Sequence, residues 1–354
     1  MSPESARRDC EPRRPQPNAP VLRTAAMIAS LDAEGYELVE APFGHALVDL
    51  AGKDPRVLGL TADLAKYTDL HIFAAAFPDR FYQMGMAEQL LFGAAAGLAR
   101  EGFLPFATTY AVFAARRAYD FIAMQIAEPG LAVKMVCALP GLTTGYGPSH
   151  QATEDLAIFR GLPDLVVVDP CDADDILGMV PEIAAHPGPV YARLLRGRVP
   201  RVLTRHCPDY RFVLGKGRLL REGADVLAVS TGLMTMRALD AASLLAEEGI
   251  GMAVLHLPTV KPLDRELLLA EAGRRRPLLV VMENHSVVGG LGEAVARLLL
   301  EAGAVPERFR HIGLPDAFLE AGALPTLHDR YGLSVKRVAE RIRQWLVGGG
   351  RTSP

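Results

Sequence analysis

Short apolar segments alternate with helix-forming segments along most of this chain, and this alternation constrains its fold more than any other feature. Segments that are apolar on both faces are typical of strands in a parallel sheet that helices cover on both sides. The expected strands are Val57–Leu60, Ala132–Ala138, Leu165–Val168, Val190–Leu194, Val226–Ser230, Met252–His256 and Leu278–Met282. The expected helices lie at about 43–52, 86–100, 112–127, 152–160, 173–185, 234–248, 264–273 and 290–302. The pattern predicts an α/β fold with parallel sheets.

The length of 354 residues suggests two domains. We expect two doubly wound α/β domains, one at 25–196 and a smaller one at 211–346. The linker between them is predicted at 197–210, where two prolines, three arginines and little periodicity occur. Residues 1–24 are rich in Pro, Arg and Glu, and 347–354 begin with a glycine-rich stretch, so both are predicted to be disordered tails.

Composition excludes several classes of function. The formal net charge of −3 gives no electrostatic case for nucleic acid as a partner. Cys10, Cys137, Cys171 and Cys207 lie far apart, which favours reduced thiols in a cytoplasmic protein over disulfides or a zinc site. The longest apolar run, Leu90–Ala99, is too short to span a bilayer. We therefore expect no nucleic acid and no membrane among its partners.

One carboxylate, Glu88, stands in the first turn of the apolar helix expected at 86–100. Burial raises the pKa of a carboxyl group, whereas a helix N-terminus lowers it. A group balanced between these effects can hold or release a proton near neutral pH. The structural alternative is a capping carboxylate that interacts only with the helix dipole.

Motifs in three places resemble those of the transketolase family. Gly85-Met86-Ala87-Glu88-Gln89 is similar to the family's glutamate motif, and Pro105–Phe113 resembles its aromatic segment. Gly147-Pro148-Ser149-His150-Gln151 resembles its G-P-T-H-Q loop. Each motif alone is a weak signal, but their order and spacing together are a strong one. The resemblance covers about residues 36–346 and implies a pyrimidine-binding domain followed by a transketolase C-terminal domain, with thiamine diphosphate as the cofactor.

The resemblance also implies roles for individual residues. Glu88 would share a proton with the aminopyrimidine ring of the cofactor, which activates the reactive carbon. Phe113 would stack on that ring, and His150 would transfer a proton or bind a substrate hydroxyl. The other cofactor contacts implied are Asp63, Leu64, Tyr110 and Arg116, and the other substrate contacts are Lys66, Tyr146 and Arg196.

Local evidence leaves alternatives open for several of these residues. Tyr110 and Phe113 also fit core packing, His150 fits a structural histidine, and Arg196 fits a surface arginine at a strand end. The segment Glu283–Gly292 follows a strand and opens a helix, so its backbone N–H groups suit either an anion or a plain packing turn. We assign that segment no chemistry.

The chain departs from the family pattern in two ways. It lacks the G-D-G motif and distant Asn that hold the metal and the diphosphate. The resemblance therefore implies a separate diphosphate-binding, N-terminal-type transketolase subunit that supplies the Mg²⁺ ligands, in a heterotetramer. The substrate pocket also differs, because Tyr146 replaces an aspartate, and Lys66 and Tyr67 stand where a serine is expected. These changes suggest a modified or branched sugar phosphate, as in split transketolases proposed to handle apulose phosphate.

The leading hypothesis is one subunit of a transketolase that moves a two-carbon ketol unit from a ketose phosphate to an aldose phosphate. Two related alternatives are the beta subunit of a 2-oxoacid dehydrogenase and a deoxyxylulose phosphate synthase-like enzyme. A non-catalytic scaffold is an alternative of another class, against which Glu88, Phe113 and His150 argue. A generic nucleotide-binding protein is disfavoured because the sequence has neither G-x-G-x-x-G after its first strand nor a P-loop.

Overall fold

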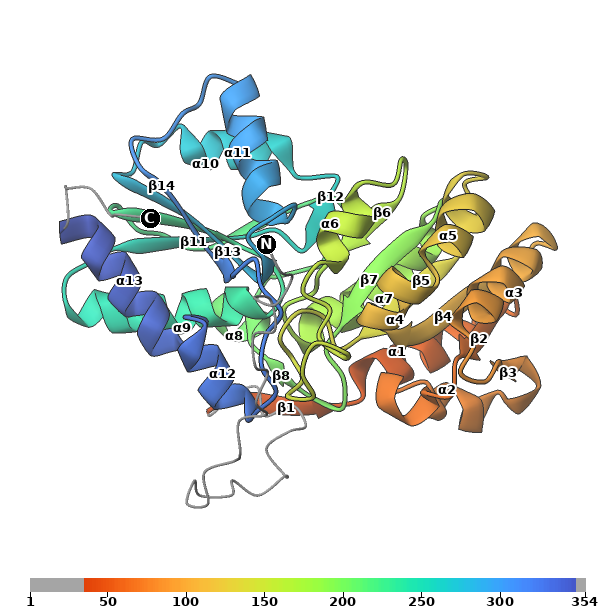
Figure 1. Cartoon of the computed structure of the whole chain (residues 1–354). Helices are drawn as coiled ribbons and strands as arrows, with labels where there is room; N and C mark the ends of the chain where they lie inside the picture. Colours follow the sequence, from red (N-terminus) through yellow and green to blue (C-terminus); the bar gives the residue numbers. More distant parts are fainter. Residues whose placement is uncertain (1–34, 348–354) are drawn as a thin grey trace, which may run out of the picture.

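The computed structural model describes residues 35–347, which form two α/β domains side by side (Figure 1). Both sheets are mainly parallel, which confirms the predicted α/β class. The predicted tail at 1–24, the start of the predicted first domain, and residues 348–354 lie outside the described residues.

The first domain is built on a seven-stranded sheet with the order β12-β6-β7-β5-β4-β2-β3. All neighbours are parallel except β12, which pairs antiparallel with β6. β12 follows the second domain's first strands in the chain, so the two domains share this sheet. The strands are β2 (Val57–Thr61), β3 (Phe81–Gln83), β4 (Leu104–Tyr110), β5 (Lys134–Ala138), β6 (Val166–Val168), β7 (Val190–Leu194) and β12 (Thr259–Lys261).

β4 is an interior strand that the sequence analysis did not identify as a strand. Every residue from Leu104 to Tyr110 is buried, and β4 pairs with β2 on one side and with β5 on the other. A proline and two threonines interrupt the apolar character of this segment, which hides its strand pattern in the sequence. β4 is nevertheless central to the site, because it ends at Tyr110.

The helices of the first domain pack in two groups. In one group α1 contacts α2 and α7, and in the other α3 contacts α5 while α4 contacts α6. The stretch predicted as one helix at 112–127 is divided into two α-helices and a π-helical turn at 123–127. The helices are α1 (Pro42–Ala51), α2 (His71–Ala76), α3 (Glu88–Arg100), α4 (Ala111–Arg117), α5 (Tyr119–Ile122), α6 (Asp155–Arg160) and α7 (Ala173–Ala185).

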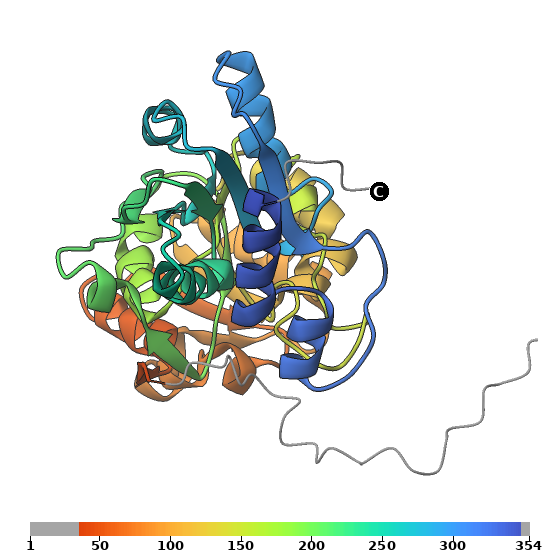
Figure 2. The same ribbon diagram turned by 90° about the vertical axis from the view of Figure 1, so that its left-hand side faces the viewer.

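The second domain has a five-stranded sheet with the order β14-β13-β10-β11-β9, in which only β9 is antiparallel to its neighbour. Figure 1 shows α10 and α11 on one side of this sheet and α9 and α13 on the other. α9 and α13 pack together on the side that faces the viewer in Figure 2. Strands are β9 (Arg218–Arg221), β10 (Val226–Ser230), β11 (Met252–His256), β13 (Leu278–Ser286) and β14 (Phe309–Leu314); helices are α9 (Leu233–Glu247), α10 (Arg265–Ala272), α11 (Leu291–Glu301), α12 (Leu324–Arg330) and α13 (Val335–Val347).

The predicted linker at 197–210 has regular structure. It forms β8 (Arg198–Arg201), which pairs antiparallel with β1 (Glu37–Glu40), and the short helix α8 (Leu203–His206). The buried carboxylate of Asp172 accepts hydrogen bonds from the backbone N–H groups of Val202 and Leu203, at 2.6 and 2.7 Å. The connection between the domains is therefore fixed to the first domain. Within residues 35–347, no helix has the length and apolar character that crossing a membrane requires.

Candidate active site

A cavity of about 460 Å³ lies at the carboxyl ends of β2 and β4. The carboxyl edge of a parallel sheet is where α/β folds place their ligand sites. The lining residues are Ala62, Asp63, Leu64, Tyr67, Met86, Glu88, Tyr110, Phe113, Arg117, Tyr146 and His150. A larger cavity of about 570 Å³ lies in the second domain, around the C-terminal ends of α10 and α11, and contains none of the predicted site residues.

Most of the site residues predicted from the sequence come together in the smaller cavity. Seven of the ten line it, and they come from segments far apart in the chain: Asp63, Leu64, Glu88, Tyr110, Phe113, Tyr146 and His150. Lys66, Arg116 and Arg196 do not line it. The placement supports a shared site, while the individual roles stay predictions.

Glu88 is the first residue of α3 and is only 2% exposed. A buried carboxylate is costly unless it is paired. Its ion-pair partner is Arg117, whose Nη1 lies 3.1 Å from Oε1 and 2.9 Å from Oε2 of Glu88. The same guanidinium lies over the ring of Phe113, with its central carbon 4.4 Å from the ring centroid. Glu88, Phe113 and Arg117 therefore form one contact unit in the cavity wall.

Arg117 was not predicted from the sequence, which pointed to Arg116. Both residues are near Phe113 on a helix, at spacings of i+3 and i+4, so the sequence signal did not separate them. In the structure the side chain of Arg116 points to the loop that carries Pro148 and Gln151 instead. It pairs with Glu154 and donates to the backbone carbonyls of Pro148 at 2.7 Å and Gln151 at 3.2 Å.

Aromatic rings form another wall of the cavity. The ring centroids of Tyr110 and Phe113 are 5.7 Å apart. The imidazole of His150 lies 6.2 Å from Tyr110, 5.5 Å from Phe113 and 5.4 Å from Tyr146. The Oγ of Ser149 is 2.9 Å from Nδ1 of His150. Aromatic faces next to an imidazole suit a flat heterocyclic ligand that is approached by a proton-transfer group.

Two basic residues predicted to contact substrate lie outside the cavity lining. The guanidinium carbon of Arg196 is 5.6 Å from the ring centroid of Tyr67, which itself lines the cavity. The Nε of Arg196 is buried and has no hydrogen-bond partner among residues 35–347. Lys66 is exposed on the 3₁₀ turn Ala65–Thr68. Arg196 is thus the better placed of the two for an anion at the cavity edge.

The loop that carries Tyr146 and His150 is held by the second domain. The backbone of Leu142 is bonded on both sides: its N–H donates to Oδ1 of Asn284 at 2.9 Å, and its carbonyl lies 2.7 Å from Nε2 of His328. Gly141 has a φ of +56°, and a Cβ at this position would lie 2.0 Å from the carbonyl oxygen of Asn284. We call residues 140–151 the clamped loop, because its conformation depends on these contacts.

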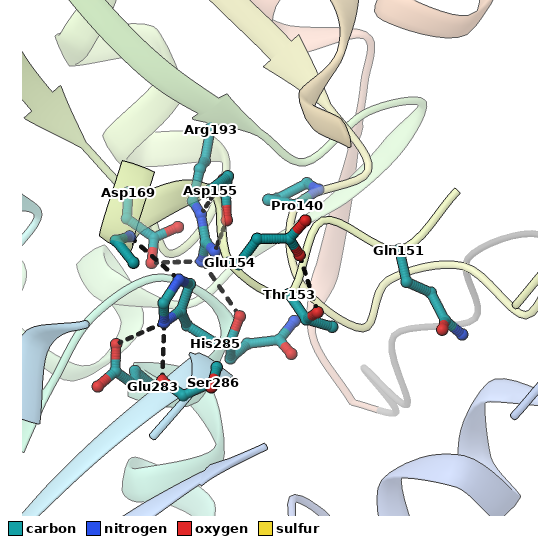
Figure 3. Close-up of polar contacts among 12 residues, drawn as sticks. Pro140, Gln151, Thr153, Glu154, Asp155, Asp169, Arg193, Glu283, His285 and Ser286 are labelled. Carbon is teal, nitrogen blue, oxygen red and sulfur yellow. Dashed lines mark hydrogen bonds and ion pairs between the residues drawn. The ribbon is translucent and has the colours of Figure 1, made fainter. Parts of the chain in front are cut away.

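A buried charge cluster (Figure 3) is connected to the clamped loop through Asn284. Arg193 of β7 is 1% exposed, and Figure 3 shows it between Asp155 and Asp169. Its guanidinium donates to both carboxylate oxygens of Asp155, and the bond from Nε is 2.8 Å long. It also donates to Asp169 at 3.3 Å and to the backbone carbonyl of Asn284 at 3.2 Å. Burial raises the pKa of Asp169 to about 6, although the positive charge of Arg193 opposes this. Arg193 thereby joins the first sheet to β13 of the second domain.

The segment Glu283–Gly292, for which an anion site and a packing turn stayed open, is occupied by the chain itself. The fully buried carboxylate of Glu283 accepts the backbone N–H groups of Leu291 and Gly292 at 2.7 and 2.8 Å, at the start of α11. Nε2 of His311 lies 2.8 Å from the same carboxylate. Burial acts to raise the pKa of Glu283, but the bond from His311 and the nearby charges hold it below its ordinary value. The segment is therefore a packing turn, and its backbone N–H groups bind the carboxylate of Glu283.

The cavity residues fit the pyrimidine end of thiamine diphosphate. The guanidinium of Arg117 is a flat group with N–H donors, and it already lies over Phe113 and donates to Glu88. A flat heterocycle with a protonated ring nitrogen can make the same two contacts. For the metal the result differs, because residues 35–347 include no cluster of three or more His, Cys, Asp or Glu side chains that could hold an ion.

Both domains of the chain are similar to known proteins. Residues 39–201 match the family model of the transketolase pyrimidine binding domain, and residues 215–338 match that of the transketolase C-terminal domain. The chain is 64% identical over 327 residues to an uncharacterized transketolase family protein of Sinorhizobium fredii, covering 92% of this chain and 94% of that one. It is 41% identical over 299 residues to a 6-deoxy-6-sulfo-D-fructose transketolase subunit of Clostridium sp. strain MSTE9, covering 84% and 91%.

Longer relatives and solved structures are also similar. A 1-deoxy-D-xylulose-5-phosphate synthase of Geobacter sulfurreducens is 34% identical over 315 residues, which cover 88% of this chain but 48% of that protein. The chain thus spans about half the length of that relative. A split gene transketolase, described as an inactive beta4 tetramer, superimposes with a TM-score of 0.78 at 44% identity, covering 86% of this chain and 97% of that one.

Proposed function

This chain belongs to the transketolase family, and we propose that it is one subunit of a thiamine diphosphate-dependent transketolase. The enzyme would transfer a two-carbon ketol unit from a ketose phosphate to an aldose phosphate. The observation that carries this proposal is the buried Glu88 carboxylate, which lines an aromatic cavity and accepts from the flat guanidinium of Arg117 that lies over Phe113. This arrangement suits a ring that must exchange a proton with a carboxylate.

Within the proposed enzyme, Glu88 holds and exchanges a proton with a pyrimidine ring nitrogen, and Phe113 and Tyr110 form the wall against which that ring lies. When bound, thiamine diphosphate supplies the nucleophilic carbon that protein side chains lack. His150 is next to both aromatic rings and would transfer a proton to or from a substrate hydroxyl. Asp63 and Leu64 line the same cavity and would contact the cofactor beside its ring.

A second polypeptide would supply the diphosphate site and the Mg²⁺ ligands. Three observations support this part of the proposal. The described residues hold no candidate metal cluster. The chain spans about half of the related synthase, whereas it covers 97% of the split gene transketolase subunit. The name of that subunit describes a tetramer of beta chains that is inactive. We therefore propose that activity requires a heterotetramer with a diphosphate-binding subunit.

The donor sugar is expected to carry an anionic group. The buried Nε of Arg196 has no partner within the described part of the chain and lies near Tyr67 at the cavity edge. A guanidinium binds a phosphate through two parallel hydrogen bonds, and a sulfonate offers the same oxygen geometry. A sulfonated ketose is therefore the second candidate donor, favoured by the 41% identity to the 6-deoxy-6-sulfo-D-fructose transketolase subunit.

The test is a ketol-transfer assay on this chain co-expressed with a diphosphate-binding transketolase subunit, with thiamine diphosphate and Mg²⁺. Ketose phosphates, a 6-sulfo ketose and pyruvate serve as separate donors. Turnover with a ketose and not with pyruvate supports the proposal, and pyruvate turnover alone would move the assignment to the synthase or oxoacid class. The Glu88→Gln variant should lose nearly all turnover, because an amide cannot exchange the proton, while Glu301→Gln on the surface of α11 should keep it.

A further inference from the structure

We infer that Arg117 is a placeholder for the cofactor ring: it occupies the Glu88–Phe113 site while the cofactor is absent and leaves it when the ring enters. This inference rests on the proposed function, because it concerns the same cavity. It adds a competition between a side chain of the protein and the cofactor for a single site. The competition would lower the affinity of the protein for its own cofactor.

The contacts of Arg117 support this inference. One nitrogen, Nη1, lies within hydrogen-bond distance of both carboxylate oxygens of Glu88, and the central carbon of the guanidinium lies over the ring of Phe113, 4.4 Å from its centroid. These two contacts are the ones that a pyrimidine ring would need in order to stack and to donate a proton. Two groups cannot occupy the same face of Phe113 and the same side of the Glu88 carboxylate. Binding of the ring therefore requires that Arg117 move.

Arg117 has the freedom to move, in contrast to its neighbour. It is the last residue of α4, and its side chain is 48% exposed, so the guanidinium can rotate into solvent without disturbing the helix. In the cavity it donates to Glu88 and lies over the ring of Phe113. Arg116 is fixed by Glu154 and by two backbone carbonyls of the clamped loop. The chain thus has one anchored and one replaceable arginine side by side.

The placeholder also has a physical purpose. Glu88 is almost completely buried, and a buried carboxylate without a partner is strongly destabilising. With Arg117 in place, the carboxylate has an ion-pair partner and the aromatic ring of Phe113 is covered before the cofactor arrives. When the ring donates to Glu88 instead, the carboxylate exchanges one partner for another, and Arg117 becomes free to pair in solvent. The exchange keeps Glu88 paired throughout.

The inference is tested by measuring the dissociation constant of thiamine diphosphate by calorimetric titration. The protein is this full chain co-expressed with a diphosphate-binding subunit, in the presence of Mg²⁺. Arg117→Ala removes the competitor and should bind the cofactor about tenfold tighter than the wild type, as expected if Arg117 fills the site most of the time. Arg117→Gln keeps a donor for Glu88 without the charge and should fall between the two. The matched control is Arg297→Ala, because Arg297 also pairs with a glutamate but lies on the surface of α11, and it should bind like the wild type.

The outcomes separate this inference from the proposed function. Unchanged or weaker binding in both Arg117 variants, with circular dichroism showing a native fold, would overturn the placeholder while leaving the cofactor assignment intact. If the wild-type complex and all variants fail to bind thiamine diphosphate at millimolar concentration, the proposed cofactor site itself is wrong, and the placeholder with it. Tighter binding in Arg117→Ala alone among the alanine variants supports the inference.

Discussion

Replacing Gly141 by alanine should strongly destabilise the chain. Gly141 has a φ of +56°, in the left-handed region that residues with a Cβ adopt at a cost. The added Cβ would lie 2.0 Å from the carbonyl oxygen and 2.7 Å from Cγ of Asn284, on β13 of the second domain. The clash is with backbone as well as side chain, so rotation of one side chain cannot relieve it.

The size of the effect follows from these contacts. The left-handed conformation costs alanine about 1–2 kcal/mol, and forcing an extra carbon into a packed contact costs about 1–3 kcal/mol. Asn284 cannot retreat freely, because its carbonyl accepts a bond from Arg193 and its Oδ1 accepts the N–H of Leu142. Losing either bond costs roughly 1 kcal/mol more. We therefore expect Gly141→Ala to lower the free energy of unfolding by about 3–6 kcal/mol.

Gly130→Ala is the matched control. Gly130 has a φ of +67°, but an added Cβ there meets no atom within 4 Å. Gly130→Ala should lower the free energy of unfolding only by the conformational cost of about 1–2 kcal/mol. Urea unfolding measures both variants, and hydrogen exchange over residues 140–151 should be faster in Gly141→Ala alone. Equal destabilisation of the two variants would show that the clamped loop is not held against Asn284 in the way described.

Three further predictions concern buried charges. Glu283→Gln should lower the free energy of unfolding by about 2–3 kcal/mol in a urea titration, because an amide accepts fewer of the hydrogen bonds at the start of α11. The control Glu301→Gln changes an exposed glutamate and should have little effect. Equal losses in the two variants would contradict the role given to Glu283. Burial lowers the pKa of Lys134 to about 7, below its ordinary 10.5. Between these two pH values the unfolded chain binds a proton at Lys134 that the folded chain does not. The contribution of Lys134 to the free energy of unfolding therefore rises with pH from about 7 to 10. In urea titrations across that range, the free energy of unfolding of the wild type should rise relative to that of Lys134→Met, by at most about 5 kcal/mol. A difference that stays constant with pH would refute the shifted pKa. Arg193→Met leaves Asp155 buried without its cation and should cost about 3–5 kcal/mol at pH 7; thermal unfolding that matches the wild type would rule out the charge cluster as the joint between the domains.

The sequence identified most of the interior strands of the two sheets, although it missed the fully buried β4. Val190–Leu194, Val226–Ser230 and Met252–His256 were predicted with the bounds that the structure has. Their signal is strong because burial on both faces demands an unbroken apolar run. β9 and β14 were missed, because edge strands carry charged residues on their exposed face.

The candidate site was predictable as far as local motifs reach. Glu88, Phe113 and His150 lie in recognisable segments, and the structure places all three at one cavity. The choice between Arg116 and Arg117 depends on the direction in which α4 presents its last turn, which spacing alone leaves open. The hydrogen bonds that Leu142 makes with the side chains of Asn284 and His328 join residues more than a hundred positions apart. No local pattern encodes such contacts, so they become visible only once the fold is known.

The position of β12 has a consequence for how this gene can be divided. β12 lies beyond the connection at 197–210, yet it completes the first sheet by pairing with β6. A break at that connection would separate β12 from β6 and leave the edge of β6 open to pairing with other chains. We therefore expect gene fission and domain exchange to keep the two domains together on one chain. A chimera that takes only one of them from another species would have to supply a foreign strand with the matching register at β6.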